Sequence, residues 1–419
     1  MSKTIIIIGA GLAGLSAALQ AAENGCNVKL VSSLPSERAQ SVMAEGGINA
    51  ALNTKDENDS PEEHFTDTIK AACGLADPNA VWGMTQAAPE LVHWLLKLGV
   101  KFNMSGYDDV DLRNFGGQKK KRTAFAQSDT GKQIMTAMID AVRRKEASGM
   151  VERFSHHSFL TLRLCGNICC GCVIRDEYSQ ETVELPGDAV IVATGGMHGL
   201  FGNTTGSLSN TGEVTAELFR LGVPLANGEM IQYHPTTVKC GGKRMLISEA
   251  ARGEGGRLFA MKDGKQWYFM EEKYPELGNL MPRDITAREI WKVSHESEVF
   301  LDMTEISEEI ISNKLSGLAD DCMTYLHKDI RKEPVSVLPG IHYFMGGILV
   351  DEQHRTPIQN LCAAGECCAQ YHGANRLGGN SLLGALYGGR VAAKSACEQA
   401  DVVDPVSYTH LRAHETLMN

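Results

Sequence analysis

The sequence predicts an α/β protein built on a Rossmann-like parallel sheet. Three apolar, strand-like runs, Thr4–Ile8, Asp188–Ala193 and Asn360–Ala364, each pass directly into a glycine-containing segment. Runs of this kind are typical of parallel strands that are covered on both faces. The carboxyl ends of such strands line the ligand crevice of an open α/β sheet, so we expect the three glycine segments to meet along one nucleotide-binding groove.

A glycine-rich turn joins the first strand to a helix. Gly9 permits the tight turn, Gly11 lets the main chain approach a pyrophosphate, and Gly14 lets the helix pack on the strand. The helix is expected over Leu15–Glu23, with its amino end toward the phosphates, and a second strand is expected over Asn27–Ser32. This βαβ pattern predicts dinucleotide binding.

An acidic residue is missing where NAD-binding folds place one. Ser32 and Ser33 stand at the end of the second strand, in place of Asp or Glu. In NAD-binding folds that carboxylate binds the ribose hydroxyls. The pattern therefore argues against NAD in particular.

Composition and charge exclude several classes of partner. The chain has 419 residues, 43% of them hydrophobic, and a formal net charge of −11, so its overall field repels nucleic acid. The one basic run, Lys119–Arg122, is expected to be a solvated loop. Residues 4–22 carry no charge, but their glycines fall at the offsets of a strand, turn and helix, so we expect no membrane span.

The cysteines predict reduced thiols in a cytoplasmic protein. Twelve cysteines form no paired framework, and no cleavable signal is evident. Cys169-Cys170-Gly171-Cys172 contains one C-x-x-C pair, but it lies in the strand-like run Ile168–Arg175 and supplies only half of a tetrahedral site. No metal is therefore expected.

One arginine stands in an uncharged, glycine-dense segment. His372–Leu383 contains Arg376 as its only charged residue and continues into an apolar, helix-like run. A guanidinium presents a planar set of donors that matches a carboxylate, and flanking glycines let backbone approach a ligand closely. The residues alone leave two interpretations open: an anion-binding arginine, or a loop arginine paired with an acidic side chain.

The rest of the chain predicts an inserted domain and an irregular tail. About a hundred residues between the second and third strand-to-glycine segments are richer in charge and partly helix-like, as over Glu305–His327. Residues 406–419 show no periodicity, so we exclude them from the fold prediction.

A series of ordered motifs resembles the flavoprotein subunits of fumarate reductase and succinate dehydrogenase, a family that also includes L-aspartate oxidase. The resemblance spans residues 4 to about 400. It rests on Ala44–Gly47, Phe115–Gly117, Arg122–Ala126, Thr130-Gly131, Ala193–Gly196, Tyr233–Thr236, Ser248-Glu249, Arg252–Gly256, Pro282–Asp284, His342–Gly347, Ala364–Glu366 and His372–Leu383.

The resemblance implies a two-segment, Rossmann-like FAD-binding domain with an inserted α+β capping domain. Its segments are expected over 1–229 and 341–403, with the capping domain over 230–340, an unreliable tail over 404–419, and no counterpart of the family's C-terminal helical domain. It implies FAD-binding roles for Gly9, Gly11, Gly14, Ser32, Ser41, Gly46, Gly47, Ala193, Thr194, Gly195, Glu213, Glu366, Arg376, Asn380, Ser381 and Leu382. Among these, Glu366 matches the carboxylate that holds the ribitol or ribose hydroxyls.

Two departures from the family pattern bear on the flavin. Members with covalent flavin have a histidine where this chain has Gln40, and an amide cannot form that bond, so FAD is expected to be non-covalent. Losing the attachment removes an electron-withdrawing substituent, which favours reduction of fumarate over oxidation of succinate. Glu213 stands where the family usually has Asp, and we expect the extra methylene to shift a flavin contact.

The resemblance also assigns the substrate site. Arg376, His342, His234 and Ser248 match residues that hold the two carboxylates of fumarate, and Arg283 matches the proton donor. A guanidinium ordinarily keeps its proton, so this role needs a second cation, low dielectric and a carboxylate to return the proton. Arg252 supplies the second cation and Glu249 the carboxylate, and their three-residue spacing would place them on one face of a helix. The alternative is a salt bridge that steadies the capping domain, and Arg288 is a second candidate donor.

Three functions remain open from the sequence. The leading one is an FAD enzyme that reduces fumarate to succinate. The first alternative is L-aspartate oxidase or a reductase of another unsaturated carboxylate, and the second is a catalytically silent, flavin-carrying electron-transfer component. Some members of the family dock an iron-sulfur subunit, and others act alone or with fused redox domains, so the resemblance implies an external electron donor. The protein is expected to be cytoplasmic, and an iron-sulfur partner would bring it to the inner face of the membrane.

Overall fold

The central sheet is five-stranded and wholly parallel. The computed structural model describes residues 2–107 and 109–399, and within it the strand order is β20-β10-β1-β2-β6. These strands are Leu361–Ala363, Ala189–Val192, Thr4–Ile8, Asn27–Ser32 and Val151–Ser155. The three predicted strand-to-glycine segments are therefore neighbours in one sheet, which confirms the fold class.

Strand β1 separates two hydrophobic cores. Ile5 and Ile7 pack among the helices, whereas Ile6 and Ile8 face the core under an antiparallel sheet. Because successive side chains of a strand point to opposite faces, a run of four isoleucines is what a strand buried on both sides requires.

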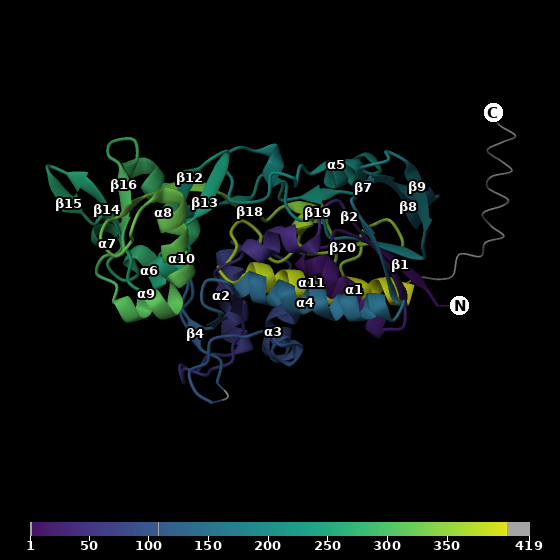
Figure 1. The fold of residues 1–419 in the computed structure, drawn as a ribbon, viewed down its shortest axis with the longest axis horizontal. Helices are drawn as coiled ribbons and strands as arrows, with labels where there is room; N and C mark the ends of the chain where they lie inside the picture. The colour runs from purple at the N-terminus through teal and green to yellow at the C-terminus, as the bar shows by residue number, and fades with distance from the viewer. Residues whose placement is uncertain (1, 108, 400–419) are drawn as a thin grey trace, which may run out of the picture.

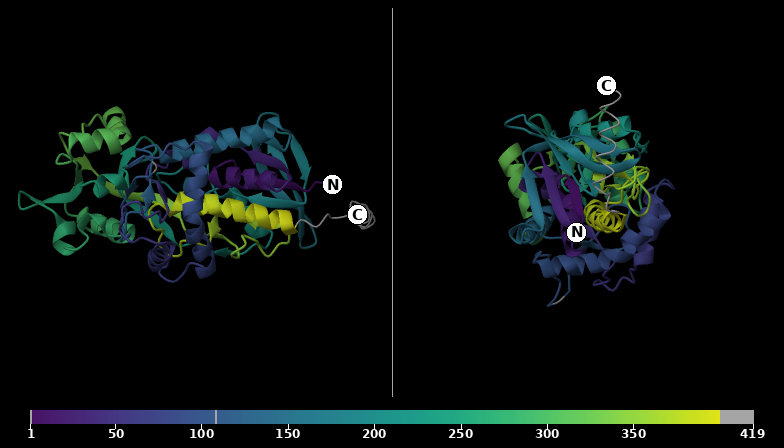
Figure 2. Two further views of the ribbon diagram at one scale, coloured as in Figure 1. Left: turned by 90° about the horizontal axis from the view of Figure 1, so that it is seen from below. Right: turned by 90° about the vertical axis from the view of Figure 1, so that its right-hand side faces the viewer.

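Four long helices lie on one side of the sheet, and three of them pack on it directly. They are α1 (Leu12–Glu23), α3 (Pro78–Leu98), α4 (Thr130–Ala147) and α11 (Asn380–Gln399). Helix α11, from the end of the described chain, lies alongside α1, from its beginning (Figures 1 and 2). Helix α1 begins three residues earlier than predicted, because extended Gly11 acts as its N-cap and the helix follows the turn at once.

A three-stranded antiparallel sheet covers the other face. Its order is β7-β8-β9, with strands His157–Cys165, Ile168–Asp176 and Thr182–Pro186, and helix α5 (Glu213–Arg220) packs against it. Short elements complete this part of the molecule: α2 (Pro61–Ala71), β3 (Ile48–Asn49), β4 (Leu112–Arg113), β5 (Thr123–Ala124), β11 (Leu225–Ala226), β19 (Gly347–Leu349) and β21 (Cys368–Ala369).

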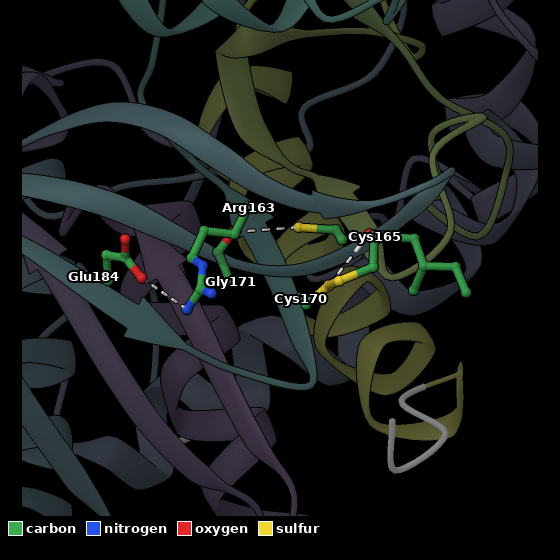
Figure 3. Close-up of a disulfide and its surroundings, with 7 residues drawn as sticks. Arg163, Cys165, Cys170, Gly171 and Glu184 are labelled. Carbon is green, nitrogen blue, oxygen red and sulfur yellow. Dashed lines mark hydrogen bonds and ion pairs between the residues drawn. A yellow bond between two sulfur atoms is a disulfide. The ribbon is translucent and has the colours of Figure 1, made fainter. Parts of the chain in front are cut away.

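The prediction that all cysteines are reduced is wrong for one pair. Cys165 at the end of β7 and Cys170 in β8 form a disulfide across the hairpin, whose turn is Gly166-Asn167 (Figure 3). Two cysteines five residues apart gave no framework in the sequence, and only the hairpin turn brings them together. Of the remaining ten cysteines, Cys169 and Cys172 are buried thiols whose pKa burial raises to about 11 and about 12.

A second unit, which we call the cap, lies at the far end of the molecule from β1 (Figure 1). Its sheet has the order β15-β14-β16-β17, and it has its own hydrophobic core. The strands are β14 (Arg257–Lys262), β15 (Lys265–Trp267), β16 (Val299–Asp302) and β17 (Val335–Ser336), and the helices are α6 (Glu249–Gly253), α7 (Phe269–Lys273), α8 (Arg283–Val293), α9 (Glu308–Lys314) and α10 (Ser316–Asp321).

A further antiparallel sheet lies between the cap and the rest of the molecule (Figure 1). Its order is β13-β12-β18, with strands Lys243–Leu246, Ile231–Cys240 and Leu338–Phe344. The domain boundaries predicted at 229/230 and 340/341 fall just before β12 and inside β18, and they stay a prediction. The predicted tail 404–419 lies outside the described residues.

The basic run is a solvated loop only in part. Lys119 and Lys121 are exposed, but Arg122 is fully buried, with Asp59 Oδ1 at 2.8 Å and Asp67 Oδ2 at 3.0 Å. A charge this deep needs paired carboxylates. Both acids come from a segment far from Arg122 in sequence, so the run itself gave no sign of the ion pairs.

No helix in the described residues has the length and apolar character to cross a membrane.

Candidate active site

One long cavity runs from the end of β2 to the cap. Most of the predicted site residues line it. They are Gly9, Gly11, Ser32, Ser41, Gly46, Gly47, Ala193, Thr194, Gly195, Glu213, His234, Ser248, Glu249, Arg283, His342, Glu366, Arg376, Ser381 and Leu382. Gly14, Arg252 and Asn380 do not line it, and each supports a residue that does.

The β2 end of the cavity fits a dinucleotide. A side chain at Gly9 would place its Cβ 2.3 Å from the carbonyl oxygen of Ala193, and one at Gly14 would place it 1.8 Å from the carbonyl oxygen of Gly9. The glycines thus permit the tight turn and the close helix packing that their spacing predicts. Ser32 Oγ is buried without a hydrogen-bond partner among the described residues, which fits a ligand hydroxyl there.

Glu45 is a cavity residue that the sequence interpretation left without a role. Its Oε2 is buried with no hydrogen-bond partner among the described residues. Burial raises the pKa of Glu45 to about 8, with nearby Asp321 adding to the rise and Arg113 opposing it. Its motif, Ala44–Gly47, was recognised, but the pKa depends on residues distant in sequence.

Asn380 supports the cavity wall from behind. Its Oδ1 accepts from Asn49 Nδ2 at 2.7 Å, and its Nδ2 donates to Thr68 Oγ1 at 2.9 Å. Asn49 Nδ2 also donates to the carbonyl of Gly378 at 2.7 Å. This fully buried network holds the chain between Arg376 and α11, so that Ser381 and Leu382 face the cavity.

At the cap end, two buried guanidiniums meet on one amide. Arg283 Nη1 and Arg376 Nη2 donate to Gln232 Oε1 at 3.1 and 3.0 Å. Arg283 is the first residue of α8 in the cap, whereas Arg376 precedes α11, so the two come from opposite sides of the cavity. Gln232 was missed by sequence reasoning, although it lies two residues before His234 in a strand, a spacing that places both on one face.

Glu249 and Arg252 back Arg283 as their spacing predicts. Glu249 Oε2 accepts from Arg283 at 2.6 and 2.7 Å, and Oε1 accepts from the Gly116 N–H at 2.8 Å. Helix α6 brings Arg252 Nη2 within 3.5 Å of Glu249 Oε1, and Arg252 Nη1 donates to the carbonyl of Asn279 at 2.6 Å. Burial would raise the pKa of Glu249, but Arg283 and Arg252 outweigh it and lower the pKa below its ordinary value.

At the cap end of the cavity, the buried arginines outnumber the buried carboxylates. Arg376 is buried with its Nε unpartnered among the described residues. Burial, together with the nearby charge of Arg283, lowers the pKa of Arg376 to about 9. A guanidinium so placed gains most from a bound anion.

His234 and His342 are neutral hydrogen-bonding groups. Their ring centroids lie 5.1 Å apart, and burial together with Arg283 lowers the pKa of both well below the usual range. His342 Nδ1 lies 2.8 Å from Thr205 Oγ1, and His234 Nε2 has no partner among the described residues. Ser248 caps α6, its Oγ accepting from the Ala250 N–H at 3.4 Å.

A family model described as "FAD binding domain" matches residues 4–382. The chain is 44% identical over 403 residues to the succinate dehydrogenase flavoprotein subunit of Bacillus subtilis, covering 94% of this chain and 69% of that protein. It is 34% identical to the 8-methylmenaquinol:fumarate reductase flavoprotein subunit of Wolinella succinogenes, covering 98% and 68%.

The fold agrees with that of a solved relative. Escherichia coli quinol fumarate reductase FrdA, solved as a mutant, superposes with a TM-score of 0.89 at 29% identity, covering 99% of this chain and 74% of that chain. The cavity residues and these matches together identify the cofactor as FAD. The chain belongs to the FAD-binding family of succinate dehydrogenase and fumarate reductase flavoprotein subunits, oxidoreductases that act on CH–CH groups.

Proposed function

We propose that this protein interconverts fumarate and succinate, with reduction of fumarate as the favoured direction. The proposal rests on one cluster of buried charges at the cap end of the cavity. It holds three arginines but only one carboxylate: Arg252, Arg283, Arg376 and Glu249. Such an excess of guanidinium fits a substrate that brings two negative charges of its own.

Arg376, His342, His234 and Ser248 would hold the substrate carboxylates. The free Nε of Arg376 and the free Nε2 of His234 are buried atoms that, among the described residues, still need hydrogen-bond partners. Neutral histidines add donors without opposing the arginines electrostatically. Fixing both ends of a short dicarboxylate places its double bond at one position, which is the main requirement of a hydride transfer.

Bound FAD, once reduced by the electron donor, would supply the hydride that is added to one alkene carbon and would return to its oxidised form. Arg283 would deliver the proton to the other carbon, so that fumarate gains one hydride and one proton to give succinate. Glu249, with Oε2 on the Arg283 guanidinium, would return a proton to it, and the positive charge of Arg252 lowers the cost of the deprotonated intermediate state.

Non-covalent flavin is part of the proposal. Gln40 lies on the cavity wall in the short 3₁₀ helix Gln40–Met43, where its side-chain nitrogen donates to the Thr205 carbonyl at 3.4 Å. An amide has no nucleophilic ring nitrogen, so FAD should leave the protein on denaturation. An iron-sulfur subunit is the proposed electron donor, and through it the protein would sit at the inner face of the membrane.

Reoxidation of the reduced flavoprotein tests the proton donor. Dithionite-reduced wild-type protein should be reoxidised by fumarate, Arg283→Lys should react at least about a hundredfold more slowly, and Arg283→Gln more slowly still. The control is Arg288→Gln, because Arg288 lies on the same helix with its side chain 63% exposed. If wild type and both Arg283 variants are reoxidised at equal rates, Arg283 is not the proton donor. If only Arg288→Gln is reoxidised more slowly, Arg288 is the proton donor instead.

The same assay separates the alternatives. An L-aspartate oxidase would reduce its flavin with L-aspartate, which would leave the flavin of a fumarate reductase oxidised. A silent electron-transfer component would show yellow flavin that fumarate does not reoxidise.

A further inference from the structure

A histidine lies behind the cavity wall, in contact with the carboxylate predicted to hold the cofactor. His198 is 1% exposed, with Nε2 3.0 Å from Glu366 Oε1 and Nδ1 2.8 Å from Thr204 Oγ1. Its ring meets Phe344 edge to face at 5.0 Å. It does not line the cavity itself, and no role was assigned to it from the sequence.

The chain makes room for this ring. A Cβ at Gly206 would lie 2.2 Å from both Cγ and Nδ1 of His198, so only glycine permits the imidazole to occupy its place. The same glycine donates its N–H to Thr204 Oγ1 at 3.0 Å, which fixes the hydroxyl that His198 contacts. A Cβ at Gly196 would likewise lie 2.6 Å from Glu366 Oε1.

The hydrogen bonds determine which oxygen of Glu366 faces the ligand. Carboxylate Oε1 accepts from the Phe344 N–H at 3.0 Å and from His198. A carboxylate oxygen accepts hydrogen bonds, so His198 donates from Nε2 in its contact with Glu366. Within the described residues, both hydrogen bonds to the Glu366 carboxylate are accepted by Oε1. Oε2 therefore remains available to a ligand in the cavity that Glu366 lines.

His198 also connects the segment that precedes the cap with segments that follow it, through hydrogen bonds. It belongs to the segment before the cap, whereas Glu366 and Phe344 follow the cap. Thr204 Oγ1 donates to the Ile341 carbonyl at 3.2 Å, and Thr205 Oγ1 donates to the same carbonyl at 3.4 Å and lies 2.8 Å from His342 Nδ1. One buried line of hydrogen bonds therefore extends from the cofactor carboxylate toward the substrate histidine.

We propose that His198 is a positioning residue for FAD, which holds Glu366 so that its Oε2 binds a hydroxyl of the ribityl or ribose part. This rests on the FAD role proposed for Glu366, and it is independent of whether fumarate is the substrate. The imidazole acts through Glu366 and touches no reacting atom.

Isosteric replacements test the proposal without substrate. Glutamine at 198 keeps a donor near the Nε2 position, asparagine keeps one near Nδ1, and leucine keeps neither. FAD titrated into apoprotein should bind His198→Leu at least about tenfold more weakly, as expected for a lost hydrogen bond to a charged group, and His198→Gln within about threefold of wild type. His198→Asn should resemble leucine. The control is His93→Gln, at an exposed histidine on α3.

A double-mutant cycle shows whether His198 acts through Glu366. In a Glu366→Ala background, adding His198→Leu should weaken FAD binding no further. If His198→Leu does not fold, Gly206→Ala replaces it, because the added methyl group displaces the ring. The proposal is overturned if His198→Leu or its replacement Gly206→Ala binds FAD as tightly as wild type, or if His198→Leu and Glu366→Ala weaken FAD binding additively.

Discussion

Arg283 on α8 of the cap and Arg376, which precedes α11, donate to one atom, Gln232 Oε1, at 3.1 and 3.0 Å. Two buried cations repel each other, so an uncharged acceptor between them stabilises their close approach. Gln232 Nε2 in turn donates to the Arg376 carbonyl at 2.7 Å and to Asn375 Oδ1 at 2.7 Å, which fixes the orientation of the amide.

The shared amide predicts the effect of changing it. Gln232→Leu removes both hydrogen bonds and should lower kcat/KM for fumarate about 10–100-fold, because the arginines lose their common position. Gln232→Glu should bind fumarate more weakly still, since its carboxylate occupies the anion site. FAD affinity, measured by titration, should be unchanged in both variants; wild-type kcat/KM in Gln232→Leu would contradict the account.

Dicarboxylate binding should depend on the charge of Arg376. Its pKa is lowered to about 9, so the cation that binds anions is present below that pH and lost above it. Succinate affinity should therefore fall as pH rises through about 9, by up to about tenfold per pH unit. Isothermal titration of the FAD-loaded protein between pH 7 and 10 measures this, and a flat profile would show that Arg376 does not bind the anion.

The raised pKa of Glu45 predicts a pH-dependent cost to stability. A carboxyl whose folded pKa is near 8, above its ordinary value of 4.5, favours the folded state at low pH, and this contribution is lost as pH rises from about 4.5 to 8. Glu45→Gln should therefore be more stable than wild type at pH 9, by up to about 4–5 kcal/mol, and within about 1 kcal/mol of it at pH 5. Urea unfolding at both pH values tests the sign.

Arg122 predicts a large loss of stability. Arg122→Met leaves Asp59 and Asp67 buried without their cation, which should destabilise the fold by about 3–5 kcal/mol. Lys121→Met, at the exposed neighbour, should change stability by less than about 0.5 kcal/mol. Comparable urea midpoints for the two variants would refute the importance of these ion pairs.

The sequence predicted the features that local patterns encode. The isoleucine run and Gly9 placed the first strand and turn correctly, because a doubly buried strand and a positive backbone angle each restrict the residues allowed. The three-residue spacing of Glu249 and Arg252 likewise predicted their contact on one helical turn.

Contacts between segments that are distant in sequence could not be predicted from local patterns. The burial of Arg122 depends on acids about sixty residues earlier, the Cys165–Cys170 disulfide depends on a hairpin turn, and the role of His198 depends on a carboxylate 168 residues away. Gln232 could have been found from its spacing to His234, but nothing in the strand showed that two arginines would converge on it.

Anaerobic mixing of fully reduced protein with fumarate tests the central claim most directly. The flavin should return to its oxidised spectrum in a single saturable phase, and one succinate should form for each flavin oxidised. A flavin that stays reduced in the presence of saturating fumarate would contradict the account.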